Sequence, residues 1–160
     1  LTDAAATEVD PRRGGAMVGR VHDENCYIQG GVAGHAGLFG HALDVARFGQ
    51  HLLAVDGGMT GIVSRDTLQT CWGASSRGGD GHHRGGWDTP SGTVSSAGRG
   101  FREASTVGHL GFTGTSLWID PERELVGVLL TNRVHPSRRN EAIRVARPDV
   151  YDRIHDAMVR

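Results

Sequence analysis

The hydrophobic residues between positions 42 and 53 recur every three to four residues, which is the period of one face of an α-helix. We therefore predict an amphipathic helix here, ended by the pair Gly57-Gly58. A shorter helix is predicted to begin after Ser64, because serine is a good N-cap residue and apolar residues follow it on one face. The apolar face of the first helix is expected to comprise Ala42, Val45, Ala46, Phe48, Gly49, Leu52 and Leu53.

Two later stretches have the pattern of β-strands. Residues 115–120 alternate apolar and polar side chains, and residues 125–131 form a continuous aliphatic run, which is typical of a strand covered on both faces. Pro121 suits the second position of a turn between them. We predict an antiparallel hairpin near the centre of a sheet, and a further short strand at residues 86–88.

The rest of the second half divides into a loop and a helix. Residues 73–106 are rich in glycine, serine and arginine, which predicts a long loop. A last helix is expected to begin near Pro148, because proline suits a first helical turn. The succession of elements favours an α+β fold with a mostly antiparallel sheet. The apolar stripe of the last helix is expected to be Val150, Ile154, Ala157 and Met158.

Composition narrows the classes of function. The chain has 160 residues and a formal net charge of −1. A length of this kind normally forms one domain, and without a basic cluster no nucleic-acid partner is expected. No apolar run approaches the ~20 residues of a membrane span. The chain begins without methionine or a signal peptide, so we expect a processed chain, a partial reading frame or a cut chain. The cysteines Cys26 and Cys71 are expected to be separate thiols, and no cofactor motif is present.

Residues 108–120 carry the strongest functional signal. They read Gly-His-Leu-Gly-Phe-Thr-Gly-Thr-Ser-Leu-Trp-Ile-Asp, and the predicted strand that follows ends in Leu-Leu-Thr-Asn-Arg. This sequence resembles the serine β-lactamase and penicillin-binding-protein family, most closely the class C-related branch with its esterases and D-Ala-D-Ala carboxypeptidases. Residues 21–25, 34–39 and 44–48 resemble the same branch. The resemblance implies a partial β-lactamase/transpeptidase-like α+β fold, with helices packed on antiparallel strands and without the N-terminal part.

Members of that family build their site from three motifs. These are Ser-x-x-Lys with the nucleophile, Tyr-x-Asn or Ser-x-Asn, and Lys-Thr-Gly or His-Thr-Gly on a strand along which the substrate lies. Here a leucine replaces the threonine of the third motif, so a hydroxyl that would face the substrate is missing. By resemblance, the substrate-side motif falls on His109, Leu110 and Gly111, and the residues expected to line the cleft are Phe112, Thr113 and Gly114.

The nucleophile and its base are not expected in this chain. All 17 residues of the lysine and arginine classes are arginines, so Ser-x-x-Lys cannot occur, and Tyr-x-Asn is absent too. A serine hydroxyl is a weak nucleophile without a nearby base. We predict a single C-terminal fragment of a β-lactamase-related domain, inactive alone. Its parts are a loop and helical part at 1–72, a glycine-rich loop at 73–106, a strand hairpin at 107–133 and a helix at 148–159.

By resemblance, the complete protein hydrolyses an amide or ester through an acyl-serine, and its substrate is a small-molecule or peptide acyl compound. An extracytoplasmic location, periplasmic or secreted, follows from the same resemblance. The alternative is a non-catalytic module that keeps the cleft as a binding surface for cell-wall peptide or a protein partner.

For several residues a purely structural role is an alternative to a functional one. The imidazole of His109 could be tied by a hydrogen bond within its strand, and Gly111 and Gly114 could serve a turn rather than a close approach to substrate. Residues 22–24 (His-Asp-Glu) are interpreted as polar anchors rather than a metal site, because neighbouring side chains on an extended segment point opposite ways. His35 is interpreted as a hydrogen-bonding structural residue, and residues 82–83 (His-His) as solvated. The serines Ser95, Ser96 and Ser116 are not expected to be nucleophiles, since none lies in a nucleophile motif.

Overall fold

A five-stranded antiparallel sheet forms the centre of the computed structural model, which describes residues 3–73 and 83–159. The strand order follows the sequence, so each strand pairs with the next one along the chain. The predicted hairpin and the predicted short strand are both present. The strands are β3 (His83–Arg84), β4 (Trp87–Asp88), β5 (Val107–Leu110), β6 (Ser116–Asp120) and β7 (Leu125–Leu129).

The hairpin is not central in this sheet, contrary to the prediction. β6 lies between β5 and β7, and β7 is the last strand of the order in the described part of the chain. Its aliphatic run reflects burial of its two faces, which two layers of helix provide. A strand can be covered on both faces and still lie at an edge, so hydrophobicity alone does not locate it within the sheet.

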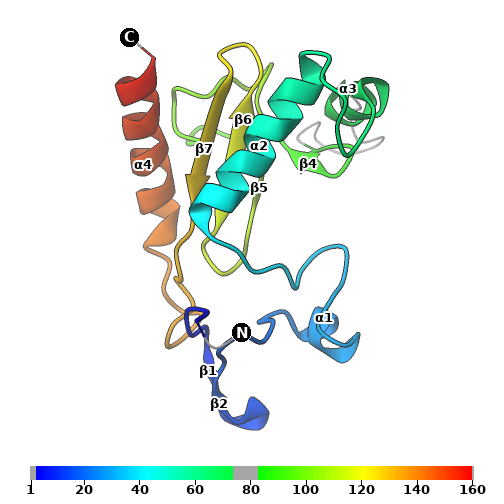
Figure 1. Cartoon of the computed structure of the whole chain (residues 1–160). Helices are drawn as coiled ribbons and strands as arrows, with labels where there is room; N and C mark the ends of the chain where they lie inside the picture. The colour runs from blue at the N-terminus through cyan, green and yellow to red at the C-terminus, as the bar shows by residue number, and fades with distance from the viewer. Residues whose placement is uncertain (1–2, 74–82, 160) are drawn as a thin grey trace.

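Helices cover the two faces of the sheet (Figure 1). On one face lie α2 (Ala42–Asp56) and α3 (Arg65–Gly73), and on the other lies α4 (Ile143–Met158). In α2, Gly49 lets the helix approach β7, because a Cβ there would come within 2.7 Å of the Val126 side chain. The predicted cap of α3 is present, with the Thr67 amide donating to Ser64 Oγ at 3.1 Å.

Two hydrophobic clusters separate the layers. Under α2 and α3, the buried residues are Leu52, Val55, Leu68, Trp72, Val107 and Ile119. Under α4, they are Ala97, Phe101, Trp118, Leu125 and Tyr151. In the predicted face of α2, Phe48 is 42% exposed while Val55, which was not predicted, is fully buried.

The last helix begins earlier than expected and buries a different stripe. α4 starts at Ile143 and contains Pro148, five residues into the helix. Its buried residues are Ile143, Arg147 and Tyr151, whereas Met158 of the predicted stripe is 68% exposed. The polar groups of Arg147 and Tyr151 bond to main-chain carbonyls of the sheet, so two residues that look solvent-facing in the sequence are the buried ones.

Residues 3–40 lie beyond one end of the sheet (Figure 1). A small two-stranded sheet pairs β1 (Val9–Asp10) with β2 (Gly15–Ala16), separated by the 3₁₀-helix η1 (Pro11–Arg13), and α1 (Glu24–Ile28) follows. The segment joins the main body through its backbone, since the Val9 amide donates to the Pro136 carbonyl at 2.9 Å. None of these elements was predicted, because the segment has few apolar positions.

Both cysteines are free thiols, as expected, with Cys26 buried and Cys71 half-buried. In the described residues, the helices are too short or too polar to cross a membrane.

Candidate active-site strand

His109 lies on β5 and faces the layer of α2 and α3. Strand residues alternate between faces, and Val107, two residues earlier, is buried under those helices while Leu110 packs on the α4 side. His109 is opposite Leu117 of β6, which also packs under α2. The His109 side chain is exposed. The strand therefore presents an accessible imidazole on the face that α4 does not cover.

One imidazole nitrogen of His109 is engaged and the other is open. Nδ1 lies 2.9 Å from the Leu110 carbonyl oxygen, which can only accept, so Nδ1 carries the proton and donates it. No described residue bonds to Nε2. In the neutral ring Nε2 is an acceptor, and in the protonated ring it is a donor. The hydrogen bond of the alternative, structural interpretation of His109 is thus present, and it leaves Nε2 without a partner among the described residues.

Strand β5 lies between β4 and β6, but it is paired more extensively with β6 than with β4. On the β6 side, all four residues of β5 are in register with a partner. On the β4 side, the only register pair in the described part of the chain is Asp88 with Gly108. The register of Asp88 with Gly108 sets Trp87 opposite His109, so β4 already lies on this side, and the accessible group of β5 is the His109 side chain rather than an open backbone edge.

The turn from β5 to β6 explains two of the glycines. The Gly111 amide donates to the Thr115 carbonyl at 2.8 Å, and the Gly114 amide donates to the Gly111 carbonyl at 3.0 Å. Gly114 has φ +109°, which favours glycine, and a Cβ at Gly111 would overlap the Thr115 hydroxyl. Both glycines thus have a role in the turn itself.

Phe112 at the tip of this turn is held between two segments. Its ring stacks on the His22 imidazole with centroids 5.7 Å apart, and the Arg133 guanidinium lies 4.2 Å from the centre of the ring. Arg133 also donates to the Phe112 carbonyl at 2.7 Å. The turn is therefore fixed against the N-terminal segment although Phe112 is 58% exposed.

A network of charged groups lies behind Phe112. His22 Nε2 is 3.0 Å from a carboxylate oxygen of Glu8, and Arg138 donates to the same oxygen at 2.7 Å. Arg138 also binds Glu24 at 2.7 Å. The Arg138 guanidinium is the main cause that holds the pKa of Glu8 at about 2, below its ordinary value of 4.5, against a smaller opposing effect of burial.

The residues considered for a metal site are engaged with other partners. His22 binds Glu8, Glu24 binds Arg138, and Asp23 caps α1 by accepting from the Cys26 amide at 2.7 Å. His35 Nε2 lies 3.0 Å from Asp23, which is the structural bond expected of it. The described residues bring together no group of three potential metal ligands. His82 lies outside the described residues.

Sequence reasoning missed the contribution of α4 to this region. Arg147 donates to the carbonyls of Gly111 and Thr115, at 2.8 and 3.0 Å. The Tyr151 hydroxyl lies 3.0 Å from the Ser116 carbonyl and 2.9 Å from Ser116 Oγ. Ser116 is buried beneath α4, so it is inaccessible to a substrate. The i, i+4 spacing of Arg147 and Tyr151 is the one sequence signal that places them on one helix face.

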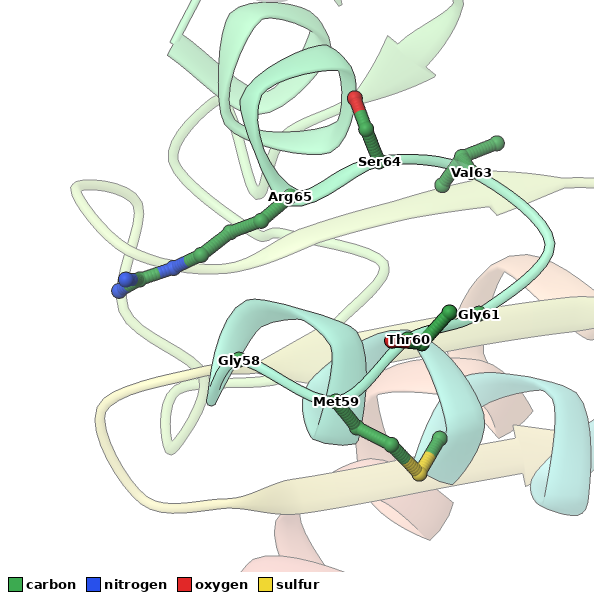
Figure 2. Close-up of a pocket in the computed structure, with 7 residues that line it drawn as sticks. All are labelled: Gly58, Met59, Thr60, Gly61, Val63, Ser64 and Arg65. Carbon is green, nitrogen blue, oxygen red and sulfur yellow. The ribbon is translucent and has the colours of Figure 1, made fainter.

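Two surface hollows of the described residues lie near the C-terminal end of α2, away from the turn at 111–115. One lies in the loop between α2 and α3, along residues 58–65, and Figure 2 shows its one charged side chain, Arg65, extending outward from the loop. The second is lined by the end of α2 and by Pro121 and Glu124. Since residues 121–124 and the turn at 111–115 lie at opposite ends of β6, neither hollow is part of the His109 region.

Comparisons with known proteins identify the family to which the chain belongs. The sequence profile of the beta-lactamase family matches residues 2–150, so the chain belongs to the beta-lactamase family of serine hydrolases. A protein of Escherichia coli O157:H7 named "Putative D-alanyl-D-alanine carboxypeptidase" is 36% identical over 127 residues, which are 73% of this chain and 27% of that protein. Proteins with the same name from Escherichia coli K12 and Salmonella agona SL483 are 35% and 34% identical, over 77% and 82% of this chain.

The chain spans less than a third of the length of these relatives, 29% and 31% for the latter two. No solved structure matches it. The fold found here, an antiparallel sheet between layers of helix, is consistent with part of a β-lactamase-like domain.

Proposed function

We propose that this chain supplies the substrate-side strand of a serine acyl hydrolase whose nucleophile lies on residues outside these 160. In this proposal the end of β5 that carries His109 contacts an acyl peptide or ester, and the His109 side chain faces the reacting group. Phe112, Thr113 and Gly114 form the end of that subsite. The whole of 1–160 then acts as the C-terminal portion of one β-lactamase-related domain, without turnover of its own.

The observation that carries this proposal is the exposed His109 on β5, one of whose imidazole nitrogens has no partner among the described residues. His109 occupies the position of the cationic residue in the family motif, and its Nε2 is free to contact a ligand. The antiparallel register of Asp88 with Gly108 sets Trp87 of β4 opposite His109, so the substrate would meet this strand through the exposed His109 side chain. Leu110 packs on the α4 side of the sheet, so the leucine in place of threonine points away from the face that carries His109.

The names of the relatives favour a peptide ending in D-alanyl-D-alanine as substrate. In the family reaction a serine attacks the carbonyl of such a peptide, the terminal amino acid leaves, and water hydrolyses the acyl-serine. His109 would stabilise the bound peptide from the strand side. Such peptides belong to bacterial cell walls, so the proposal implies an extracytoplasmic place of action.

The test compares the 160-residue chain with the polypeptide encoded by the complete reading frame. Both are treated with a labelled penicillin and with a fluorophosphonate, and the modified residue is mapped by mass spectrometry. We expect labelling only in the longer polypeptide, at a serine of a Ser-x-x-Lys sequence. Rapid labelling of a serine within the 160 residues would overturn the proposal. A reading frame with no such sequence would favour the binding module instead.

The role of His109 is tested in the longer polypeptide. Replacing His109 with Ala should lower kcat/KM for an acyl-D-alanyl-D-alanine peptide by roughly 10²-fold, the effect of removing one polar group from a reacting centre. The matched control is His41→Ala, because His41 is exposed next to α2 and its side chain makes no cap bond. Equal activity of the His109→Ala variant and the wild type would show that the strand histidine takes no part.

A further inference from the structure

Arg147 of α4 is a buried cation without an acidic partner. The residue is only 9% exposed, and no carboxylate among the described residues forms an ion pair with it. Arg138, in contrast, pairs with the carboxylates of Glu8 and Glu24. Burial lowers the pKa of Arg147 from its ordinary value. Because burying an unpaired charge is costly, the contacts of this guanidinium require an explanation.

The contacts of Arg147 all go to the turn that follows the candidate substrate strand. One terminal nitrogen donates to the Gly111 carbonyl at 2.8 Å and to the Thr115 carbonyl at 3.0 Å. These are the two ends of the turn, and they are also joined by the bond from the Gly111 amide to the Thr115 carbonyl. Arg147 therefore fixes the point where β5 ends and β6 begins.

Tyr151, one helical turn further on, holds the next residue. Its buried hydroxyl donates toward Ser116, with 3.0 Å to the carbonyl and 2.9 Å to Oγ. Burial raises the pKa of Tyr151 to about 12, so the phenol keeps its proton and remains a donor. One face of α4 thus binds three carbonyls of the hairpin, those of Gly111, Thr115 and Ser116.

A second arginine holds the same turn from the opposite direction. Arg133 donates to the Phe112 carbonyl at 2.7 Å, and its other contacts are the carbonyls of Arg138 and Asn140. Arg133 therefore holds the middle of the turn, at Phe112, whereas Arg147 holds its two ends. What the loss of Arg147 removes is the tie between the turn and α4, which sets where the end of β5 lies.

We propose that Arg147, supported by Tyr151, is a positioning residue that fixes the end of β5 so that the His109 side chain meets the substrate at a constant place. The inference rests on the proposed function, because it takes β5 as the substrate strand. Positioning of this kind is valuable in catalysis, since a displacement of about 1 Å costs about 10²-fold in rate.

The first measurement uses the 160-residue chain and is independent of any activity. Amide hydrogen exchange is followed by NMR in the wild type, Arg147→Met, Arg147→Lys and Tyr151→Phe. The control is Arg144→Met on the same helix, where the arginine is exposed and pairs with Glu141. We expect Gly111 and Gly114 to exchange about tenfold faster in Arg147→Met, through local opening, with partial recovery in Arg147→Lys. An unchanged Gly111 rate, after correction for the melting temperature of each variant, would overturn the proposal.

The second measurement uses the longer polypeptide and separates positioning from mere stability. Arg147→Met should raise KM for the acyl peptide at least about tenfold through the displaced strand, while acylation of the serine by a small fluorophosphonate stays unchanged. Equal KM in the variant and the wild type would refute positioning while leaving the proposed function intact. If the wild type shows no acylation, the proposed function fails, and the exchange data still show whether α4 holds the turn.

Discussion

Two glycines, one on each strand that flanks β6, make room for the largest side chains under α4. Gly108 and Gly127 lie on either side of Trp118, in register across β5, β6 and β7. A Cβ at Gly108 would overlap the Trp118 ring and the Leu117 carbonyl, and one at Gly127 would come within 2.8 Å of the Tyr151 ring. The close packing of the Trp118 and Tyr151 rings against the strands therefore requires glycine at these two positions.

Replacing Gly108 with Ala should destabilise the chain by about 1–3 kcal/mol through overpacking. The methyl group meets a backbone carbonyl as well as the Trp118 ring, so rotation of one side chain cannot relieve it. Chemical denaturation followed by circular dichroism measures the change. Gly40→Ala is the control, because its added methyl meets nothing within 4 Å. Equal loss of stability in both variants would contradict this account of Gly108.

At the residue scale, sequence reasoning located His109 but not the residues that hold its strand. His109 stands in a recognisable local sequence, with glycines at positions 108 and 111. Arg147 does not, because an arginine among polar neighbours on a helix is ordinarily solvated. Its burial depends on carbonyls 32 and 36 residues away in the chain. Contacts between residues this far apart leave no periodic pattern in the sequence, so they could not be predicted from it.

At the scale of elements, the N-terminal segment is attached to the main body by charge. Glu8, next to β1, binds Arg138 from the connection between β7 and α4, and it also binds His22 ahead of α1. The side chain of Glu8 is 13% exposed. Three segments far apart in sequence therefore meet at one carboxylate.

The Glu8 carboxylate makes the free energy of unfolding depend on pH in the acidic range. Its folded pKa of about 2 lies below the ordinary 4.5, so its stabilisation is complete above pH 4.5 and is lost as the pH falls toward 2. Glu8→Gln should cost about 1–3 kcal/mol at pH 7, and the gap to the wild type should shrink between pH 4.5 and pH 2. Thermal melts across this range measure it. The control Glu141→Gln removes an exposed pair with Arg144 and should have little effect. A gap independent of pH would contradict the argument.

Elements with a strong local pattern were predictable, and those set by long-range contacts were not. β6, β7, α2 and the cap of α3 follow from alternation, periodicity and Ser64. The strands β1 and β2 have two residues each, too few for any period to show. α4 extends five residues before Pro148, which the first-turn preference of proline did not indicate.

At the scale of the whole molecule, apolar surface gathers outside the two clusters. Within residues 28–43, the exposed fractions are 81% for Ile28 and Val32, 95% for Leu38 and 62% for Leu43. β7 adds a strand edge without a neighbour in the described part of the chain. Exposed apolar patches and open strand edges both favour association.

We therefore expect the 160-residue chain to self-associate at micromolar concentrations. Sedimentation velocity should show species larger than the monomer, and Leu38→Ser should reduce them. Met158→Ser is the matched control, since Met158 is 68% exposed at the far end of α4. A sharp, reversible two-state melt of a monomer would contradict this expectation.

The tryptophans lie on both sides of the sheet, which matters for measurements of intrinsic fluorescence. Trp72 and Trp87 contact each other edge to face under α2 and α3, whereas Trp118 is buried alone of its kind among the described residues beneath α4. Indole emission from the chain is thus a sum of two spatially separate sources. In a Trp118→Phe variant the remaining emission comes from Trp72 and Trp87 and reports on the layer under α2 and α3. The wild-type spectrum minus the variant spectrum then reports on Trp118 in the layer under α4.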